Sequence, residues 1–158
     1  MCRQCLEGDI AEFGFGEAST AEGNYAAARK AFEDGIALDR ALAAKAIDAA
    51  DYEYGMSVGQ LGLGRALNRQ GDVAAALRSL EQSLQIRARQ AKSHAGNSSA
   101  ERGVAEVMRE LAITSGSKVT WADFRAQVDS MDAKRILWPA DRPWLDEART
   151  HTATEGKP

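Results

Sequence analysis

The stretch 63–86, LGRALNRQGDVAAALRSLEQSLQI, most constrains what this chain can fold into. Its apolar residues recur every three or four positions on both sides of Gly71-Asp72, which predicts two amphipathic helices joined by a tight turn. Glycine supplies the backbone angles that end the first helix, and aspartate can cap the second. Gly64 and Ala76 are small enough for two helices to approach closely. Because neither helix can bury its apolar stripe alone, the hairpin needs neighbours.

The composition agrees with an all-α fold. Hydrophobic residues make up 44% of the 158 residues, much of it alanine, whereas aromatic residues make up only 6%. This composition favours closely packed helices over a sheet, and the length suits one domain with a sizeable core. The net charge of −3 provides no basic footprint for nucleic acid. No apolar run is long enough to span a membrane and no signal peptide is evident, so we expect a cytoplasmic protein.

Two other stretches have a related pattern. In residues 12–38 a Gly23-Asn24 turn is followed by apolar residues at helical spacing, namely Tyr25, Ala28, Phe32 and Ile36. From about Ser99 a third hairpin is predicted around Ser115-Gly116-Ser117, with Thr120 as the helix N-cap. Its first stripe is Val104, Val107, Met108 and Leu111, and its second is Trp121, Phe124, Val128 and Met131.

The central hairpin resembles the tetratricopeptide repeat (TPR), whose signature has a Leu-Gly pair, a later alanine and then an aromatic residue. Leu63-Gly64, Ala76 and Leu80 occupy these places, and the first copy matches through Phe15-Gly16, Ala28 and Phe32. The resemblance implies antiparallel helical hairpins stacked in a short right-handed superhelix of about three units, followed by a C-terminal capping helix.

The repeats are longer than usual. Gly23 and Gly71 lie 48 residues apart, whereas the common TPR period is about 34 residues. The intervening alanine-rich stretch 39–55 has no helix breaker before Gly55, so we expect it to prolong the second helix of the first unit. Its apolar stripe would be Leu42, Ala43, Ala46, Ile47 and Ala50.

These patterns define the predicted domain organisation. A TPR-like domain covers residues 1–131, with units at about 9–56, 57–100 and 101–131. Residues 132–149 form a capping loop and helix, in which Asp141 is the predicted cap, and residues 150–158 form a disordered tail. Residues 57–112 look like the junction between extended TPR units of bacterial multidomain signalling proteins, which attach such arrays to effector domains.

No catalytic or metal-binding constellation is apparent. Cys2 and Cys5 form a CxxC pair without the further ligands of a zinc site or the strand of a thioredoxin-like motif. His94 lies in a predicted loop and His151 in the predicted tail, so neither is expected to be held as a base. The carboxylate pairs Glu33/Asp34 and Asp146/Glu147 suit solvated helix faces. We therefore expect no enzyme activity, no cofactor and no metal.

Recognition is expected on the first helix of each unit, which in TPR proteins lines a concave peptide-binding groove. The positions implied in the central unit are Val58, Leu61, Arg65, Asn68 and Arg69, joined by Phe13, Glu17 and Thr20 from the first unit and Glu106 and Glu110 from the third. Arg65, Asn68 and Arg69 share one helix face and could hold an acidic segment of a partner protein. The three tryptophans are expected to cover the end of the stack; the alternative is an aromatic docking site for a partner.

A second function class stays open. The chain could be a structural or self-association segment of a larger bacterial signalling protein, with a homo-oligomer forming through open repeat ends. In either class we expect no nucleic-acid or membrane partner.

Overall fold

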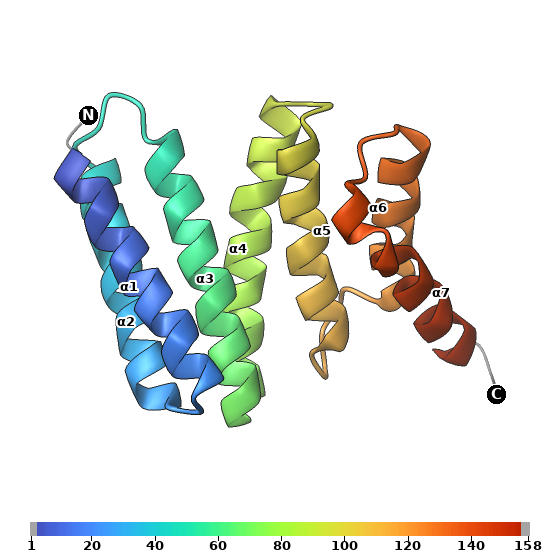
Figure 1. Cartoon of the computed structure of the whole chain (residues 1–158), viewed down its shortest axis with the longest axis horizontal. Helices are drawn as coiled ribbons and strands as arrows, with labels where there is room; N and C mark the ends of the chain where they lie inside the picture. Colours follow the sequence, from blue (N-terminus) through green and yellow to red (C-terminus); the bar gives the residue numbers. More distant parts are fainter. Residues whose placement is uncertain (1–2, 156–158) are drawn as a thin grey trace. The chain divides into compact units, whose positions relative to one another are not determined.

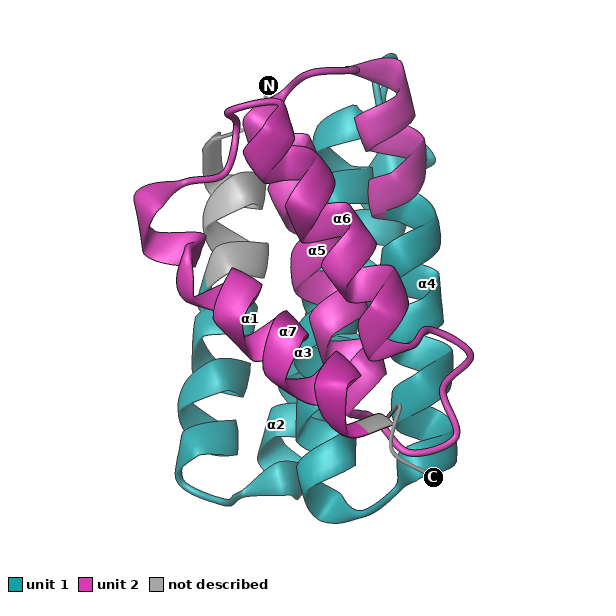
Figure 2. Cartoon of the chain, turned by 90° about the vertical axis from the view of Figure 1, so that its right-hand side faces the viewer, with its two compact units in different colours: residues 1–86 teal, residues 87–158 magenta. Residues whose placement is uncertain are grey.

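The computed structural model describes the backbone of residues 3–155 and the side chains of residues 11–154. This part of the chain is helical and has no strand, and its helices pack against their neighbours in sequence order as antiparallel hairpins (Figure 1). The predicted all-α class is thereby confirmed. The helices divide into two compact units, residues 1–86 and 87–158 (Figure 2). Cys2 and the side chain of Cys5 lie outside the described residues.

Unit 1 begins with a hairpin of two equally long helices, α1 (Arg3–Ala21) and α2 (Tyr25–Ala43). Gly23 adopts the left-handed conformation (φ 78°) that ends α1, and the Asn24 side chain accepts a hydrogen bond from the Ala27 amide at the start of α2. These are the roles that glycine and asparagine play at helix ends. The predicted Gly23-Asn24 turn is confirmed.

The second hairpin repeats this arrangement with α3 (Ala50–Gln70) and α4 (Val73–Ser93). Gly71 is left-handed (φ 90°) and closes α3, while the Asp72 carboxylate accepts a hydrogen bond from the Ala75 amide. The predicted Gly71-Asp72 turn is thus also confirmed. The C-terminal end of α4, from Arg87 onward, belongs to unit 2.

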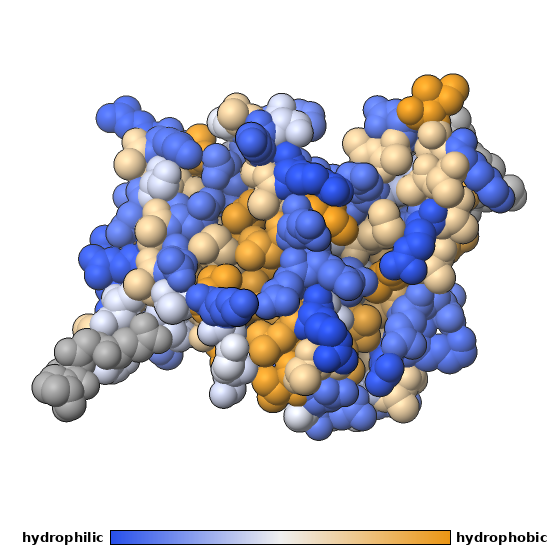
Figure 3. All heavy atoms as spheres, turned by 180° about the vertical axis from the view of Figure 1, so that it is seen from behind, coloured by the Kyte–Doolittle hydropathy of each residue, from blue (hydrophilic) through white to orange (hydrophobic). Residues whose placement is uncertain are grey.

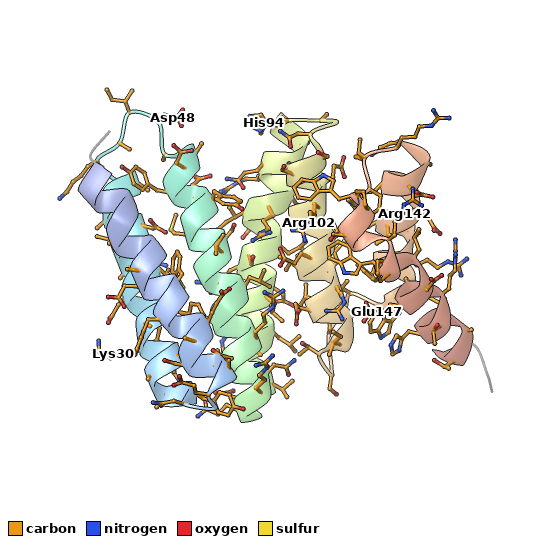
Figure 4. All side chains as sticks on the ribbon, viewed as in Figure 1. Lys30, Asp48, His94, Arg102, Arg142 and Glu147 are labelled. Atoms are coloured by element: carbon orange, nitrogen blue, oxygen red, sulfur yellow. The ribbon has the colours of Figure 1, made fainter. Side chains whose placement is uncertain are left out.

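The expected continuation of α2 through the alanine-rich stretch is wrong. Helix α2 ends at Ala43, residues 44–49 form a loop, and the predicted stripe residue Ile47 is fully exposed. Asp48, labelled in Figure 4, accepts a hydrogen bond from the Ala50 amide and starts α3 instead. Alanine favours a helix, but propensity alone does not hold one beyond the end of its packing partner. Here α2 has the same length as α1, which it packs against.

The core of unit 1 places phenylalanine rings against glycines of neighbouring helices. A Cβ atom on Gly16 of α1 would lie 2.8 Å from the Phe32 ring, and one on Gly62 of α3 would collide with the same ring. The Phe13 and Phe32 rings stack at 6.3 Å. Because these glycines have no side chain, α1, α2 and α3 can come into close contact around Phe32. The same arrangement recurs around Phe13, which lies against Gly35 of α2 and Gly59 of α3.

Helix α4 joins this core through a further close approach. A Cβ atom on Gly64 would lie 2.6 Å from Leu80 Cγ, so the small residue predicted at this position is required. Ser83 of α4 is buried and donates a 2.7 Å hydrogen bond to the Ser57 carbonyl of α3. A buried hydroxyl that finds a backbone acceptor avoids the cost of an unmade hydrogen bond. Helices α3 and α4 are therefore joined by an apolar contact at Gly64 and by a buried hydrogen bond at Ser83.

Unit 2 contains α5 (Ser98–Ile113) and α6 (Trp121–Ala133), each with an N-cap. The Asn97 side chain caps α5. Thr120 and Asp123 form a reciprocal capping box at the start of α6, which confirms the predicted role of Thr120. Hydrogen bonds from the Thr120 backbone and then from its side chain lower the pKa of Asp123 below its ordinary value of 3.8.

The core of unit 2 forms around α6. Its predicted stripe is confirmed, since four residues of α6 are buried: Trp121, Phe124, Val128 and Met131. A short 3₁₀ turn, η1 (Pro139–Asp141), leads into α7 (Pro143–Glu155), which packs on this cluster through Leu145 and Ala148. Because α7 runs to Glu155, the prediction of a disordered segment is wrong for residues 150–155. Residues 156–158 lie outside the described residues.

Candidate interaction surface

The structure removes two residues from the predicted groove. Phe13 is 8% exposed and Leu61 is 3% exposed, so neither is available to a peptide. Phe13 belongs to the core of unit 1, where its ring lies against Gly35 and Gly59. The prediction placed both residues by analogy with the TPR groove. It is wrong for these two residues because both side chains are buried in the folded unit.

Val58 and Thr20 are also committed to the fold. Val58 is partly buried against the core cluster of unit 1. Thr20 is buried and donates a 2.7 Å hydrogen bond to the Gly16 carbonyl of its own helix. Neither residue offers a free polar group for specific recognition, although the partly exposed Val58 side chain adds apolar surface.

The polar residues predicted on α3 do reach the surface. Arg65 and Asn68 are partly buried and Arg69 is exposed, and their spacing places them on one face of the helix. Helix α3 contacts both α1 and α2, and Gly64 brings it close to α4, so the backbone beneath these side chains is fixed by three neighbours. Arg69 lies in the last turn, where a cation also interacts favourably with the helix dipole. This cluster is the candidate interaction surface.

Glu17 is the remaining predicted site residue. It is exposed on α1, and the 48-residue spacing of the repeats places it at the position that Arg65 occupies on α3. An acidic and a basic residue thus occupy equivalent places on two helices that contact each other. The two hairpins of unit 1 therefore differ in the charge they present at this position.

Unit 1 as a whole is acidic, because Asp and Glu outnumber Lys and Arg within residues 1–86. An acidic ligand would gain little from the long-range field of such a unit. Its binding to Arg65 and Arg69 would have to come from short-range, charge-assisted hydrogen bonds.

Apolar surface is also exposed. Figure 3 shows one face of the molecule, on which hydrophobic side chains remain visible between hydrophilic ones. Such apolar area can add affinity for many kinds of partner, whereas charge favours only a partner of opposite sign.

In unit 2 the polar residues are arranged for structure. Arg102 of α5 donates two hydrogen bonds to Asp141 of η1, at 2.6 and 3.0 Å, and Arg109 donates two to Glu147 of α7, at 2.6 and 2.7 Å. Figure 4 labels one member of each pair, Arg102 and Glu147. The Asp141 side chain is 4% exposed. Such bidentate pairs are directional and strong, so they fix the C-terminal segment to α5. The predicted roles of Asp141 as a helix cap and of Glu147 as a solvated residue missed these pairs.

The contact with Glu147 also changes the pKa of Arg109. The hydrogen bond to Glu147 raises the pKa of Arg109 above its ordinary value, and this outweighs the opposing effect of burial. Arg87 is similarly committed: it is 5% exposed and contacts Glu106 at 3.2 Å. Glu110 lies 3.6 Å from Arg109. Glu106 and Glu110, which were predicted to join the groove, are therefore used within unit 2.

The tryptophans of unit 2 differ in exposure. Trp121 is buried and Trp144 partly buried within the core cluster, whereas Trp138 is 40% exposed. The Arg102 guanidinium lies 5.2 Å from the Trp138 ring centre and 5.5 Å from that of Trp144, which is cation–π geometry. Trp138 therefore both orders Arg102 and leaves one aromatic side chain at the surface.

His151 is held in place, contrary to the prediction of a free residue in a tail. Its ring stacks on Trp121 with centroids 3.9 Å apart and planes 7° apart. His94 lies in the loop between α4 and α5, with Nδ1 3.1 Å from the Gln90 carbonyl oxygen. Neither contact places a nucleophile beside the imidazole. Trp121 and His151 lie thirty positions apart in the sequence, and nothing in the sequence identifies them as a stacked pair.

Within the described residues, no group of three or more His, Cys, Asp or Glu side chains could hold a metal ion. No helix of this part of the chain is long and apolar enough to cross a membrane. No protein-family model, curated protein or solved structure matches the chain.

Proposed function

We propose that this chain is a TPR-like protein-interaction module that binds an acidic peptide or helix on α3. The observation that carries the proposal is the cluster of Arg65, Asn68 and Arg69 on one face of that helix, at least partly exposed and supported by a closely packed core. The two hairpins of unit 1, with their glycine-closed turns and matched small residues, support the TPR-like part of the proposal. The bacterial setting implied by the resemblance and the cytoplasmic location expected from the sequence belong to the same proposal.

The chemistry of the cluster defines the ligand. Two guanidinium groups can each hold a carboxylate through two parallel hydrogen bonds, and an asparagine amide can pair with a peptide group of the same ligand. Such contacts require carboxylates in register with one helix turn. A peptide with Asp or Glu at this spacing should therefore bind better than a peptide of the same charge in scrambled order.

Fluorescence anisotropy with labelled acidic peptides tests the proposal. The control peptides carry Asn and Gln in place of Asp and Glu. Arg65→Glu with Arg69→Glu should weaken binding of the acidic peptide at least about a hundredfold, because each charge-assisted bond contributes about 1.5–3 kcal/mol. Arg40→Glu with Arg78→Glu, two charge reversals at exposed positions of α2 and α4, should have little effect. Equal loss from both changes would point to net charge alone and would sink the proposal.

A further inference from the structure

Helix α1 carries apolar residues on two opposite faces. One face holds the buried ring of Phe13. Among the side chains that the structure describes, the other face holds Ala11, Gly14, Phe15 and Ala18, all of them exposed. Phe15 is 58% exposed, and a Cβ atom added to Gly14 would meet nothing within 4 Å. Because the buried stripe of an amphipathic helix is the face that meets a neighbour, a second apolar face on the opposite side is available to a second neighbour.

The internal repeat shows which face of α3 corresponds to this outer face of α1. The 48-residue register that superposes Gly23 on Gly71 also places Ala11, Gly14, Phe15 and Ala18 on four residues of α3: Gly59, Gly62, Leu63 and Ala66. In α3 these residues form the face that packs on the α1–α2 hairpin. Gly59 lies against Phe13 and Ile36 and Gly62 against Phe32, while the other two belong to the same core cluster.

We propose that the outer face of α1 docks a helical hairpin of the α1–α2 type. The occupant would present a bulky apolar side chain at the position of Phe32 and a smaller apolar side chain at the position of Phe13. Gly14 would receive the bulky one, as Gly62 receives Phe32, and Ala11 would admit the smaller one, because it is larger than Gly59. Phe15 would insert between the helices of the occupant, in the place that Leu63 takes on the α1–α2 hairpin.

A second copy of this chain cannot be the occupant, because the occupant needs an exposed hairpin surface. Its own α1–α2 hairpin is already covered by α3, which contacts both helices. Docking that hairpin on α1 of another copy would require this internal contact to open. The occupant is therefore a hairpin whose corresponding surface is free.

A chain with a duplicate of residues 1–48 placed ahead of Met1, the duplicate carrying Phe13→Leu, tests the proposal, because leucine lacks the ring atoms that would meet the Ala11 methyl group. The duplicate supplies an α1–α2 hairpin in the same register, with its α3-binding surface free to meet the original α1. We expect amide hydrogen exchange in the original α1 to slow at least about tenfold. The urea midpoint measured by circular dichroism should rise relative to that of the parent protein, because more apolar surface is buried.

Two substitutions in the original α1 make the test specific. Gly14→Ala should raise the midpoint of the parent, since there is open space for the methyl group and alanine favours a helix. In the extended chain the same change should remove the exchange protection, because the methyl group fills the slot. Phe15→Ser should leave the parent folded and remove the protection as well, whereas Ile47→Ser, a change at an exposed loop residue, should do neither.

Two outcomes would overturn the proposal. The first is an extended chain whose original α1 exchanges as fast as in the parent, or whose protection survives both Gly14→Ala and Phe15→Ser. The second comes from sedimentation velocity on the parent protein. A dimer that Phe15→Ser abolishes would assign the face to a second copy instead of a hairpin.

Discussion

The two units of this chain reach compactness by different means. In unit 1, glycines remove side-chain volume so that Phe13 and Phe32 lie directly against neighbouring helices. In unit 2, Arg102–Asp141 and Arg109–Glu147 connect segments that are 39 and 38 residues apart. Unit 1 should therefore be sensitive to changes in volume, and unit 2 to changes in charge. The pairs Arg29–Glu33 and Lys30–Asp34 of unit 1 lie on the surface of a single helix and contribute little.

The intrinsic fluorophores allow the two units to be followed separately. Tyr25, Tyr52 and Tyr54 lie in unit 1, whereas Trp121, Trp138 and Trp144 lie in unit 2. Tryptophan emission therefore reports on unit 2, while the far-ultraviolet circular dichroism signal reports on both units. A substitution that affects one unit should separate the two unfolding curves, and this separation measures how independent the units are.

The largest effect is expected for Phe32→Ala. Phe32 is 1% exposed and lies between Gly16 and Gly62. Removing its ring should lower the free energy of unfolding by about 3–5 kcal/mol, because the glycines leave no side chain to fill the cavity. Urea unfolding followed by circular dichroism measures the change.

The matched control is Phe15→Ala on α1, where the ring is 58% exposed. Its effect should be within about 0.5 kcal/mol. Equal losses for the two phenylalanines would contradict the glycine-lined core.

The next effect is expected for Asp141→Asn in unit 2. The change removes the charge that faces Arg102, whose side chain is 32% exposed. Solvent reaches this guanidinium, so we expect a loss of about 2 kcal/mol rather than the larger cost of a fully buried pair. Tryptophan emission should report the loss because Arg102 contacts Trp138 and Trp144.

Asp146→Asn provides the comparison for that experiment. It removes the same charge from an exposed pair with Arg149 in α7. This variant should unfold within about 0.5 kcal/mol of the wild type. If Asp141→Asn behaved the same way, the ion pairs would not be what holds the C-terminal segment.

A smaller effect is expected for His151→Ala. The substitution removes the ring stacked on Trp121 and should lower stability by about 0.5–1.5 kcal/mol. It should also shift tryptophan emission to longer wavelength, since Trp121 would gain contact with water. His94→Ala, in the loop between α4 and α5, should leave the emission unchanged; a shift there would show that the signal does not come from the stacked pair.

The smallest effect is expected for Asp123→Asn, and it depends on pH. Because the folded state lowers the pKa of Asp123, the carboxylate stabilises α6 fully above its ordinary value of 3.8 and loses this effect as the pH falls through the lowered value. The stability difference between wild type and variant should therefore shrink below about pH 4. A stability difference that stays constant over this range would contradict the capping box.

The sequence predicts the turns and stripes of this protein well because their signals are local. Gly71-Asp72 ends one helix and starts the next through bonds within a few residues. The stripe from Trp121 to Met131 follows from helical spacing alone. The end of α2 at Ala43 is different, since nothing local stops a helix in an alanine-rich stretch. There the helix is as long as its packing partner α1, and tertiary packing decides where it ends.

The candidate interaction surface could be predicted only in part. The spacing of Arg65, Asn68 and Arg69 predicts that they share one face of α3, and these side chains are at least partly exposed. Leu61 was assigned to the same groove by analogy, although it is buried. The 48-residue register provides the correction, because it aligns Leu61 with Phe13, a core residue.

The Arg102–Asp141 pair was not predictable from local pattern. Its members lie 39 residues apart, and an arginine on a helix face usually points to solvent. Only the path of the chain through α6 and η1 brings the two side chains together. A contact between residues this far apart depends on the tertiary fold, which the local sequence pattern does not reveal.

The glycines of unit 1 also affect the order in which its helices form. Helices α1 and α3 contain most of them, α2 contains one and α4 contains none. Each interior glycine weakens an isolated helix by about 0.5–1 kcal/mol, so α2 and α4 should be helical early while α1 and α3 wait for partners. In the folding transition state we expect high φ-values in α4 and low ones around Gly59 and Gly62. The residues that allow the closest packing would then be the last to become ordered.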